Sequence, residues 1–243
     1  MNRKSPVIDA SALPVAPLDL SRPAAEQIAA SLKSAILSMT LEPGQMISEN
    51  EVGQLFGASR TPVREAFAQL RDDGLLLTWP SRGTYVARLS ERQIRGAQFL
   101  REALEVAVVE RLCADGLPED ARAELALNLE QQHAAVAEDD KAAFQALDDQ
   151  FHAILARATG YDRIGGLLLR EKATLDRLRV LSLNDTAHME KLLAEHEAIL
   201  ESVQSGYSGQ ALDRMRRHLR NVLRTLSGLI DENRDYFDTD ERG

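Results

Sequence analysis

The N-terminal fold is decided by residues 56–76, which read FGASRTPVREAFAQLRDDGLL. Gly57-Ala58-Ser59 turns the chain, and Thr61-Pro62 then supplies an N-cap and a first helical residue. The helix that follows carries Phe67 and Leu70 inward and ends at Asp73-Gly74. We therefore expect a helix of about three turns, entered through a tight turn.

The flanking residues complete a recognisable layout. Apolar spacing predicts a first helix over residues 22–39, and Ser48 with Glu51 forms a capping-box pattern at the start of a second, short helix. After the third helix, LLLTWPSRGTYVARL at residues 75–89 contains two β-prone runs around a basic turn. Three helices followed by a small β-hairpin are the arrangement of a winged helix-turn-helix.

The rest of the chain shows only helical periodicity. We expect six helices over residues 90–114, 118–138, 141–158, 162–181, 186–204, and from between Gly206 and Gly209 to near Asn233. Such a series predicts an all-α antiparallel bundle, so the fold class is mainly α. The expected organisation is a flexible extension at 1–20, a winged helix-turn-helix domain at 21–88, a helical ligand-binding and dimerisation domain at 89–235, and a flexible tail at 236–243.

Composition limits the classes of function. No apolar run approaches the roughly 20 residues that a membrane span requires, and the first twenty residues lack the apolar stretch of a signal peptide. Cys113 is the only cysteine, which suits a reducing cytoplasm, where we expect the protein to act. The net charge of -9 argues against a protein that coats nucleic acid, but residues 60–88 hold five arginines and only three acids.

That basic segment predicts a DNA-reading surface. Arg60 and Arg64 lie at the start of the third helix, where arginine can contact O6 and N7 of guanine in the major groove. Ser59 and Thr61 offer hydroxyls to phosphate. The hairpin tip would place Arg82 and Gly83 at the minor groove. Taken singly, each arginine could equally be a solvated residue on an ordinary surface helix.

Residues 56–76 followed by PSRGTYV at 80–86 closely resemble the signature of GntR-family regulators, over about residues 22–88. The resemblance implies that Arg60, Thr61, Arg64 and Gly83 contact operator DNA. Some members have an arginine where this chain has Asn50, which implies a weaker DNA contact from the second helix.

Polar residues interrupt the apolar faces of the bundle, where they are costly unless paired or bound to a metal. Asp148 and His152 lie one turn apart, while His196 and His218 lie among apolar residues of later helices. Three imidazoles and a carboxylate suit a divalent transition metal, zinc first, with nickel or manganese as alternatives. Hydrogen-bonded core histidines are the competing interpretation, because spacing alone does not prove convergence.

A second resemblance bears on this question. Four stretches look like the ordered motifs of the FCD effector domain found in FadR-type members of the GntR family, in its six-helix, VanR-like form: LREALEVAVVERL at 100–112, LDDQFHAIL at 147–155, EHEAIL at 195–200 and MRRHL at 215–219. The resemblance implies that Asp148, His152, His196 and His218 bind the metal and that Arg101 holds a ligand carboxylate. An ion pair of Arg101 with Glu105 is the alternative. His133 and His188 have no such match and are expected at the surface or at helix ends.

Together these features predict a regulator rather than an enzyme. We expect a homodimer that binds palindromic operator DNA and responds to a small carboxylate effector, with repression as the mode that the resemblance implies. Two alternatives stay open: a metal-dependent enzyme built in the bundle, and a regulator whose metal is purely structural.

Overall fold

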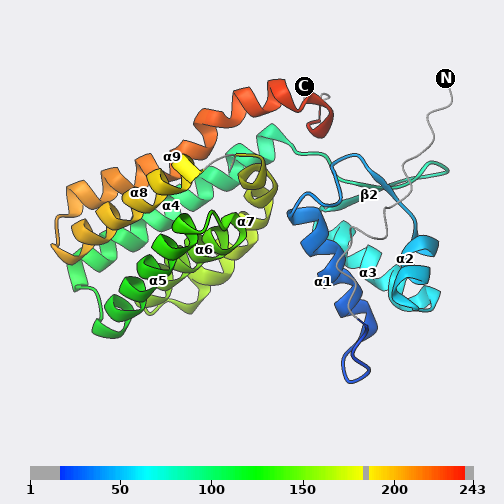
Figure 1. Ribbon diagram of the computed structural model, residues 1–243, viewed down its shortest axis with the longest axis horizontal. Coiled ribbons are helices and arrows are strands. Elements are labelled where there is room, and N and C mark those ends of the chain that lie inside the picture. Colours follow the sequence, from blue (N-terminus) through cyan, green and yellow to red (C-terminus); the bar gives the residue numbers. More distant parts are fainter. Residues whose placement is uncertain (1–16, 183–185, 239–243) are drawn as a thin grey trace. The chain divides into compact units, whose positions relative to one another are not determined.

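A computed structural model describes residues 17–182 and 186–238. The described residues form two compact units, one made of residues 17–91 and 230–238 and the other of the described residues between 92 and 229 (Figure 1). Helices dominate the described residues, and a small antiparallel sheet lies in the first unit. The predicted fold class, a winged helix-turn-helix with an all-α C-terminal domain, is confirmed.

The first unit packs three helices around one core. These are α1 (Ala24–Leu37), α2 (Glu49–Phe56) and α3 (Arg60–Asp72). Ile28 and Leu32 of α1 meet Phe67 and Leu70 of α3, and all four side chains have 0% exposure. Burial of these apolar faces fixes α3 within the unit, which leaves its other face for solvent.

The turn between α2 and α3 differs in detail from the expectation. Gly57 ends α2 with φ 60, a left-handed conformation that glycine adopts without steric cost. Ser59, and not Thr61, is the N-cap of α3, so the predicted cap position was wrong. Pro62 still lies in the first turn, where helix amides need no intrahelical partner. The predicted capping box at Ser48 is also absent, because its side chain makes no cap hydrogen bond.

The sheet has the order β1-β3-β2, with β1 (Met46–Ile47), β2 (Leu76–Trp79) and β3 (Gly83–Val86) antiparallel. The predicted hairpin is β2 with β3. Strand β1 was not expected, because two residues are too few to show a periodicity. Leu76, Val86 and Ile47 face the core, which holds one side of the sheet on the helices.

Residues 236–238, the last that the structure describes, pack against the first unit. After the short 3-10 helix Arg234–Tyr236, the Phe237 side chain is 3% exposed. The backbone amide of Leu89 donates to the carbonyl of Tyr236 at 2.8 Å, and Asp238 N donates to Leu89 O at 2.9 Å. Residues 236–238 were expected to be flexible, but burial of the Phe237 ring and these two bonds fix them. Residues 239–243, and 1–16 of the N-terminal extension, lie outside the described residues.

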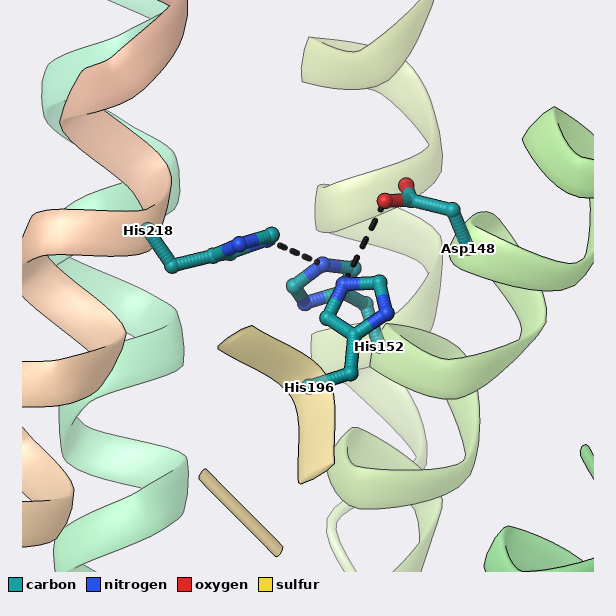
Figure 2. A group of neighbouring side chains, drawn as sticks. All are labelled: Asp148, His152, His196 and His218. Carbon is teal, nitrogen blue, oxygen red and sulfur yellow. Dashed lines mark hydrogen bonds and ion pairs between the residues drawn. The ribbon is translucent and has the colours of Figure 1, made fainter. Parts of the chain in front are cut away.

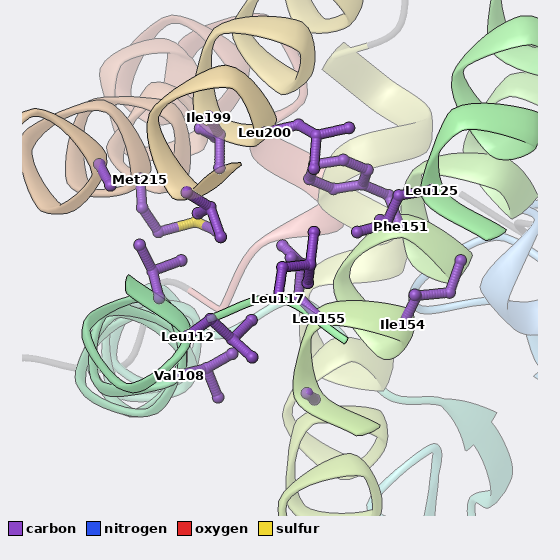
Figure 3. Close-up of a cluster of buried hydrophobic side chains, with 14 of the residues drawn as sticks. Val108, Leu112, Leu117, Leu125, Phe151, Ile154, Leu155, Ile199, Leu200 and Met215 are labelled. Atoms are coloured by element: carbon purple, nitrogen blue, oxygen red, sulfur yellow. The ribbon is translucent and has the colours of Figure 1, made fainter. Parts of the chain in front are cut away.

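The second unit contains six helices among the described residues, with boundaries close to those expected: α4 (Glu91–Asp115), α5 (Glu119–Ala137), α6 (Lys141–Ala158), α7 (Asp162–Ser182), α8 (Thr186–Gln204) and α9 (Ser208–Glu232). Helix α6 packs against α5, α7 and α8. Figure 3 shows apolar side chains from several helices meeting in one core, among them Leu112 of α4, Phe151 of α6 and Met215 of α9. Because neighbouring helices surround α6, its polar residues Asp148 and His152 are buried among them.

Candidate metal centre and basic surface

Four polar side chains converge inside the second unit. Asp148 and His152 come from α6, His196 from α8 and His218 from α9, and each offers one ligand atom within 4.8 Å of the others (Figure 2). Exposure ranges from 0% for His196 to 7% for His218. The structure thus brings together residues that are 70 positions apart in sequence, from Asp148 to His218.

A polar partner stands behind each imidazole ring. Nδ1 of His196 lies 2.8 Å from Oε1 of Gln132, and Nδ1 of His218 lies 2.9 Å from Oε2 of Glu195. Nδ1 of His152 contacts the carboxylate of Glu105. A proton on Nδ1 in each ring leaves Nε2 with a free lone pair, and the Nε2 atoms of His152 and His218 lie 3.2 Å apart. The rings are therefore oriented so that their Nε2 atoms face a common centre.

Asp148 is held in its ionised form. Oδ2 contacts Arg179 of α7, and Oδ1 points toward Nε2 of His196 at 3.3 Å. Burial alone would raise the pKa of Asp148, but the positive charge of Arg179 outweighs it and holds the pKa well below its usual range. Burial lowers the pKa of His196 and of His218. These pKa shifts favour the ionised carboxylate of Asp148 and the uncharged imidazoles of His196 and His218, the protonation states that bind metal ions.

Glu105 is a buried acid beside the centre, expected from the sequence only as a partner of Arg101. Its carboxylate is 2% exposed and lies between Nε of Arg101, at 2.7 Å, and Nδ1 of His152. Burial would raise the pKa of Glu105, but Arg101 and His152 lower it to about 2. The expected alternative for Arg101, an ion pair with Glu105, is formed. Its spacing of four residues from Arg101 on the inward face of α4 was the available signal.

A cavity of about 60 Å³ is lined by three of the four converging residues, Asp148, His152 and His218. Its polar lining beyond Asp148, His152 and His218 consists of Arg101, Gln145, Arg179, His188, Asn221 and Thr225. His188 lies in the first turn of α8, a helix end as expected, but it is half-buried and lines this cavity. His133 is exposed and contacts Glu197 at 2.8 Å, outside the cavity lining. The cavity places positively charged and amide side chains beside the convergence of imidazoles.

The basic residues of the first unit lie at its surface. Ser59, Arg60, Thr61 and Arg64 are exposed around the N-terminal end of α3, where no acid lies in the first turn. Arg82 and Gly83 are exposed at the tip of the β2–β3 hairpin. The predicted DNA-reading residues thus occupy two exposed positions of one unit, the start of α3 and the wing.

Comparison with known proteins agrees with this architecture. Residues 24–86 match the model of bacterial regulatory proteins of the gntR family, and residues 98–221 match the FCD domain. The HTH-type transcriptional repressor RspR of Escherichia coli (strain K12) is 35% identical over 221 residues, which cover 90% of this chain and 96% of that protein. The chain belongs to the GntR family. Regulators of this family bind operator DNA and are not enzymes, so the alternative of a metal-dependent enzyme is not supported.

Two further similarities extend over most of this GntR-family chain. The gluconate operon transcriptional repressor of Bacillus subtilis (strain 168) is 26% identical over 184 residues, 74% of this chain and 75% of that protein. The crystal structure of a GntR-type regulator from Rhodococcus sp. RHA1 shares the fold with a TM-score of 0.70 at 22% identity, covering 84% of this chain and 97% of that one. Within the described residues, no helix is both long and apolar enough to cross a membrane.

Proposed function

We propose that this GntR-family chain is a repressor whose FCD domain binds a divalent metal ion and, beside it, a small carboxylate effector. The observation that carries the proposal is the convergence of Asp148, His152, His196 and His218 on one buried centre next to a cavity. The lining of that cavity includes Arg101 and Arg179, and guanidinium groups are favoured partners of carboxylates.

The residues at the centre fit a metal ion. Nε2 of His196 is completely buried and lies 3.3 Å from Oδ1 of Asp148, but it makes no well-formed hydrogen bond to the described residues. With the ring proton on Nδ1, this nitrogen and the carboxylate oxygen both present lone pairs, and a metal ion between them would satisfy both. Asp148 Oδ1 and the Nε2 atoms of the three histidines would hold the ion, and we favour zinc, with nickel or manganese as alternatives. When bound, the ion supplies a Lewis acid with positions left for an effector oxygen.

The protein's own side chains would orient the effector. Arg101 uses Nε to bind Glu105, so its two terminal nitrogens stay available for a carboxylate on the cavity side. Glu105 and Glu195 keep the rings of His152 and His218 in place from behind. Asn221 lines the cavity and donates a hydrogen bond to Glu195 at 2.8 Å. An effector that contacts Asn221 would therefore act on Glu195, the residue that orients the ring of His218.

On the DNA side, we propose that Arg60 and Arg64 read bases in the major groove and that Ser59 and Thr61 bind phosphate. Arg82 and Gly83 would approach the adjacent minor groove. We take residues 21–88 as the DNA-binding domain and residues 89–235 as the effector and dimerisation domain. A homodimer would match a palindromic operator, and effector binding would favour one arrangement of the dimer and so change its DNA affinity. RspR and the gluconate operon protein are both repressors, which supports repression here.

The test combines metal analysis with DNA binding. The protein is purified without added metal, its metal content is measured, and its affinity for its own upstream DNA is followed while small carboxylic acids, gluconate among them, are added. Asp148→Ala and His196→Ala are compared with His133→Ala, which removes an exposed histidine outside the cavity lining. We expect roughly one metal ion per chain, lost in the first two variants only, and one acid that weakens operator binding.

Two outcomes contradict the proposal in different ways. Tight operator binding with no metal and no response to any acid would remove the carboxylate sensor and leave a DNA-binding regulator. Bound metal that is needed for folding, with DNA affinity indifferent to every acid, would show that the metal is purely structural.

A further inference from the structure

The sheet of the first unit has an outer face that is unusually apolar. Side chains alternate along β2, so Leu76 points to the core while Leu77 and Trp79 point outward. Leu77 is paired with Tyr85 and Trp79 with Gly83 in the register of β2 with β3. The Trp79 side chain is 55% exposed and Leu77 is 43% exposed. Neighbouring exposed apolar side chains on one sheet face, one of them an indole with a polar N–H, are suited to a contact surface.

Trp79 lies at the base of a well-braced hairpin tip. The tip turns over Pro80 and Ser81, and the amide of Arg82 donates to the carbonyl of Trp79 at 3.0 Å. Proline at the first central position and Ser81 at φ 62 fit a type II turn. The Tyr85 hydroxyl then donates to the carbonyl of Arg82 at 2.8 Å. These bonds fix the backbone of Trp79 and Arg82, so that both side chains start from one small projection.

Gly83 fixes how closely a ligand can approach this projection. It has φ 109, and a Cβ atom added there would lie 3.4 Å from Sδ of Met46. Met46 is therefore packed over Gly83 on the outer face, and the strand directly opposite carries Trp79. Gly83 itself adds no side chain beside the indole, and Met46 is the neighbour that borders this part of the outer face.

We infer that Trp79 is a DNA-contacting residue of the wing, whose indole packs against deoxyribose rings at the edge of the minor groove. The inference rests on the proposed DNA contact of Arg82 and Gly83. Arg82 is hydrogen-bonded to Trp79 across the turn, and Gly83 is the residue paired with Trp79 on the neighbouring strand. Charge favours duplex DNA as the occupant, because exposed Arg82 would meet phosphate while the apolar ring meets the sugars beside it.

The geometry also ranks the residues of this outer face. Trp79 is paired with the tip residue Gly83, whereas Leu77 lies two residues further from the tip and opposite Tyr85. A duplex that meets Arg82 reaches Trp79 before Leu77. Because sugar rings are the same in every sequence, Trp79 contributes to affinity for any duplex and not to the choice of operator.

Trp79 is the only tryptophan of the chain, so its fluorescence reports on this site alone. The full-length protein is titrated with its own upstream DNA and with an unrelated duplex, while binding is followed independently by the anisotropy of labelled DNA. We expect either DNA to change the tryptophan emission and to reduce quenching by acrylamide. Quenching that is unchanged when the anisotropy shows saturation overturns the inference and leaves DNA binding intact. Absence of an anisotropy change with any duplex removes the proposed function and the inference with it.

Variants provide a second measurement. We expect Trp79→Ala to weaken binding of both duplexes about tenfold, as loss of an aromatic contact does, while Trp79→Phe retains most of the affinity. The control Leu77→Ala, on the same strand and face, should change affinity by less than about twofold. Equal losses of DNA affinity for the two alanine variants would show that the indole has no particular role and overturn the inference. Acrylamide quenching that falls with protein concentration in the absence of DNA would assign this face to a second copy of the chain and overturn the inference as well.

Discussion

In the first unit, Arg60, Arg64 and Arg82 are exposed, whereas in the second unit Asp148 is 2% and His196 0% exposed. The exposed arginines need only a correctly placed backbone, because their proposed ligand approaches from solvent. The buried side chains need partners as well, since a polar group without one is destabilising inside a protein. The proposed DNA-binding surface therefore depends on individual side chains, whereas the proposed buried metal site depends on a network of side chains that contact one another.

The largest effect that this comparison predicts comes from the core that supports the buried network. Phe151 is 0% exposed, and its ring stacks on His196 with centroids 4.4 Å apart. We expect Phe151→Ala to lower the free energy of unfolding by about 3–5 kcal/mol, because it leaves a cavity, and to loosen His196 as well. Chemical denaturation of the purified variant measures the first effect, and metal affinity measures the second.

Phe99 provides the matched control, since it belongs to the same unit but is 73% exposed. Phe99→Ala should change stability by less than about 0.5 kcal/mol. A similar loss in both variants would mean that burial does not separate these two phenylalanines and would weaken the comparison.

The second prediction concerns a residue that touches no metal. Gln132 is buried, and Oε1 lies 2.8 Å from Nδ1 of His196. We expect Gln132→Ala to weaken metal binding about 10- to 100-fold, because the ring of His196 loses the group that orients it. Gln131→Ala is the control, as it removes an exposed glutamine one position earlier. Metal titration of the two variants decides, and equal affinities would show that Gln132 does not support the centre.

The bundle and its buried residues show which parts of the fold and of the site could be predicted from the sequence. Helical spacing and the breakers at their ends predicted α4 to α9, and the apolar stripe is strongest in α9. Asp148 and His152 could be paired by their spacing, but only the family resemblance implied that His196 and His218 join them. Glu195 and Gln132 were missed, since an acid or an amide on a helix shows no sign of contacting a distant ring.

Smaller errors arose where the local signal was ambiguous. Both Ser59 and Thr61 are good N-cap residues, and the pattern does not show which one the backbone uses. The order of the C-terminal segment could not be predicted either. Phe237 is buried and pairs with Leu89, which is far away in sequence. Tertiary contacts of this kind leave no periodicity to read.

The third prediction addresses the exposed side of the comparison. Arg64 projects from the second turn of α3, and we expect Arg64→Ala to weaken operator binding roughly tenfold and to reduce discrimination against unrelated DNA. Stability should not change, because the side chain is exposed. Arg71→Ala, at the other end of the same helix and also exposed, is the control. The anisotropy of labelled operator and of an unrelated duplex is measured with both variants. Equal losses in Arg64→Ala and Arg71→Ala would indicate a general loss of positive charge and not a base contact by Arg64.

The smallest expected effect tests whether exposed polar contacts matter for stability at all. Nζ of Lys33 lies 2.8 Å from Oδ2 of Asp73, with side chains 40% and 35% exposed. Water competes for both charges, so a double-mutant cycle with Lys33→Ala and Asp73→Ala should give a coupling energy below about 0.5–1 kcal/mol. Added salt should reduce it further. A coupling as large as the loss expected for Phe151→Ala would mean that the first unit, too, depends on its polar network, and the contrast between the two units would fail.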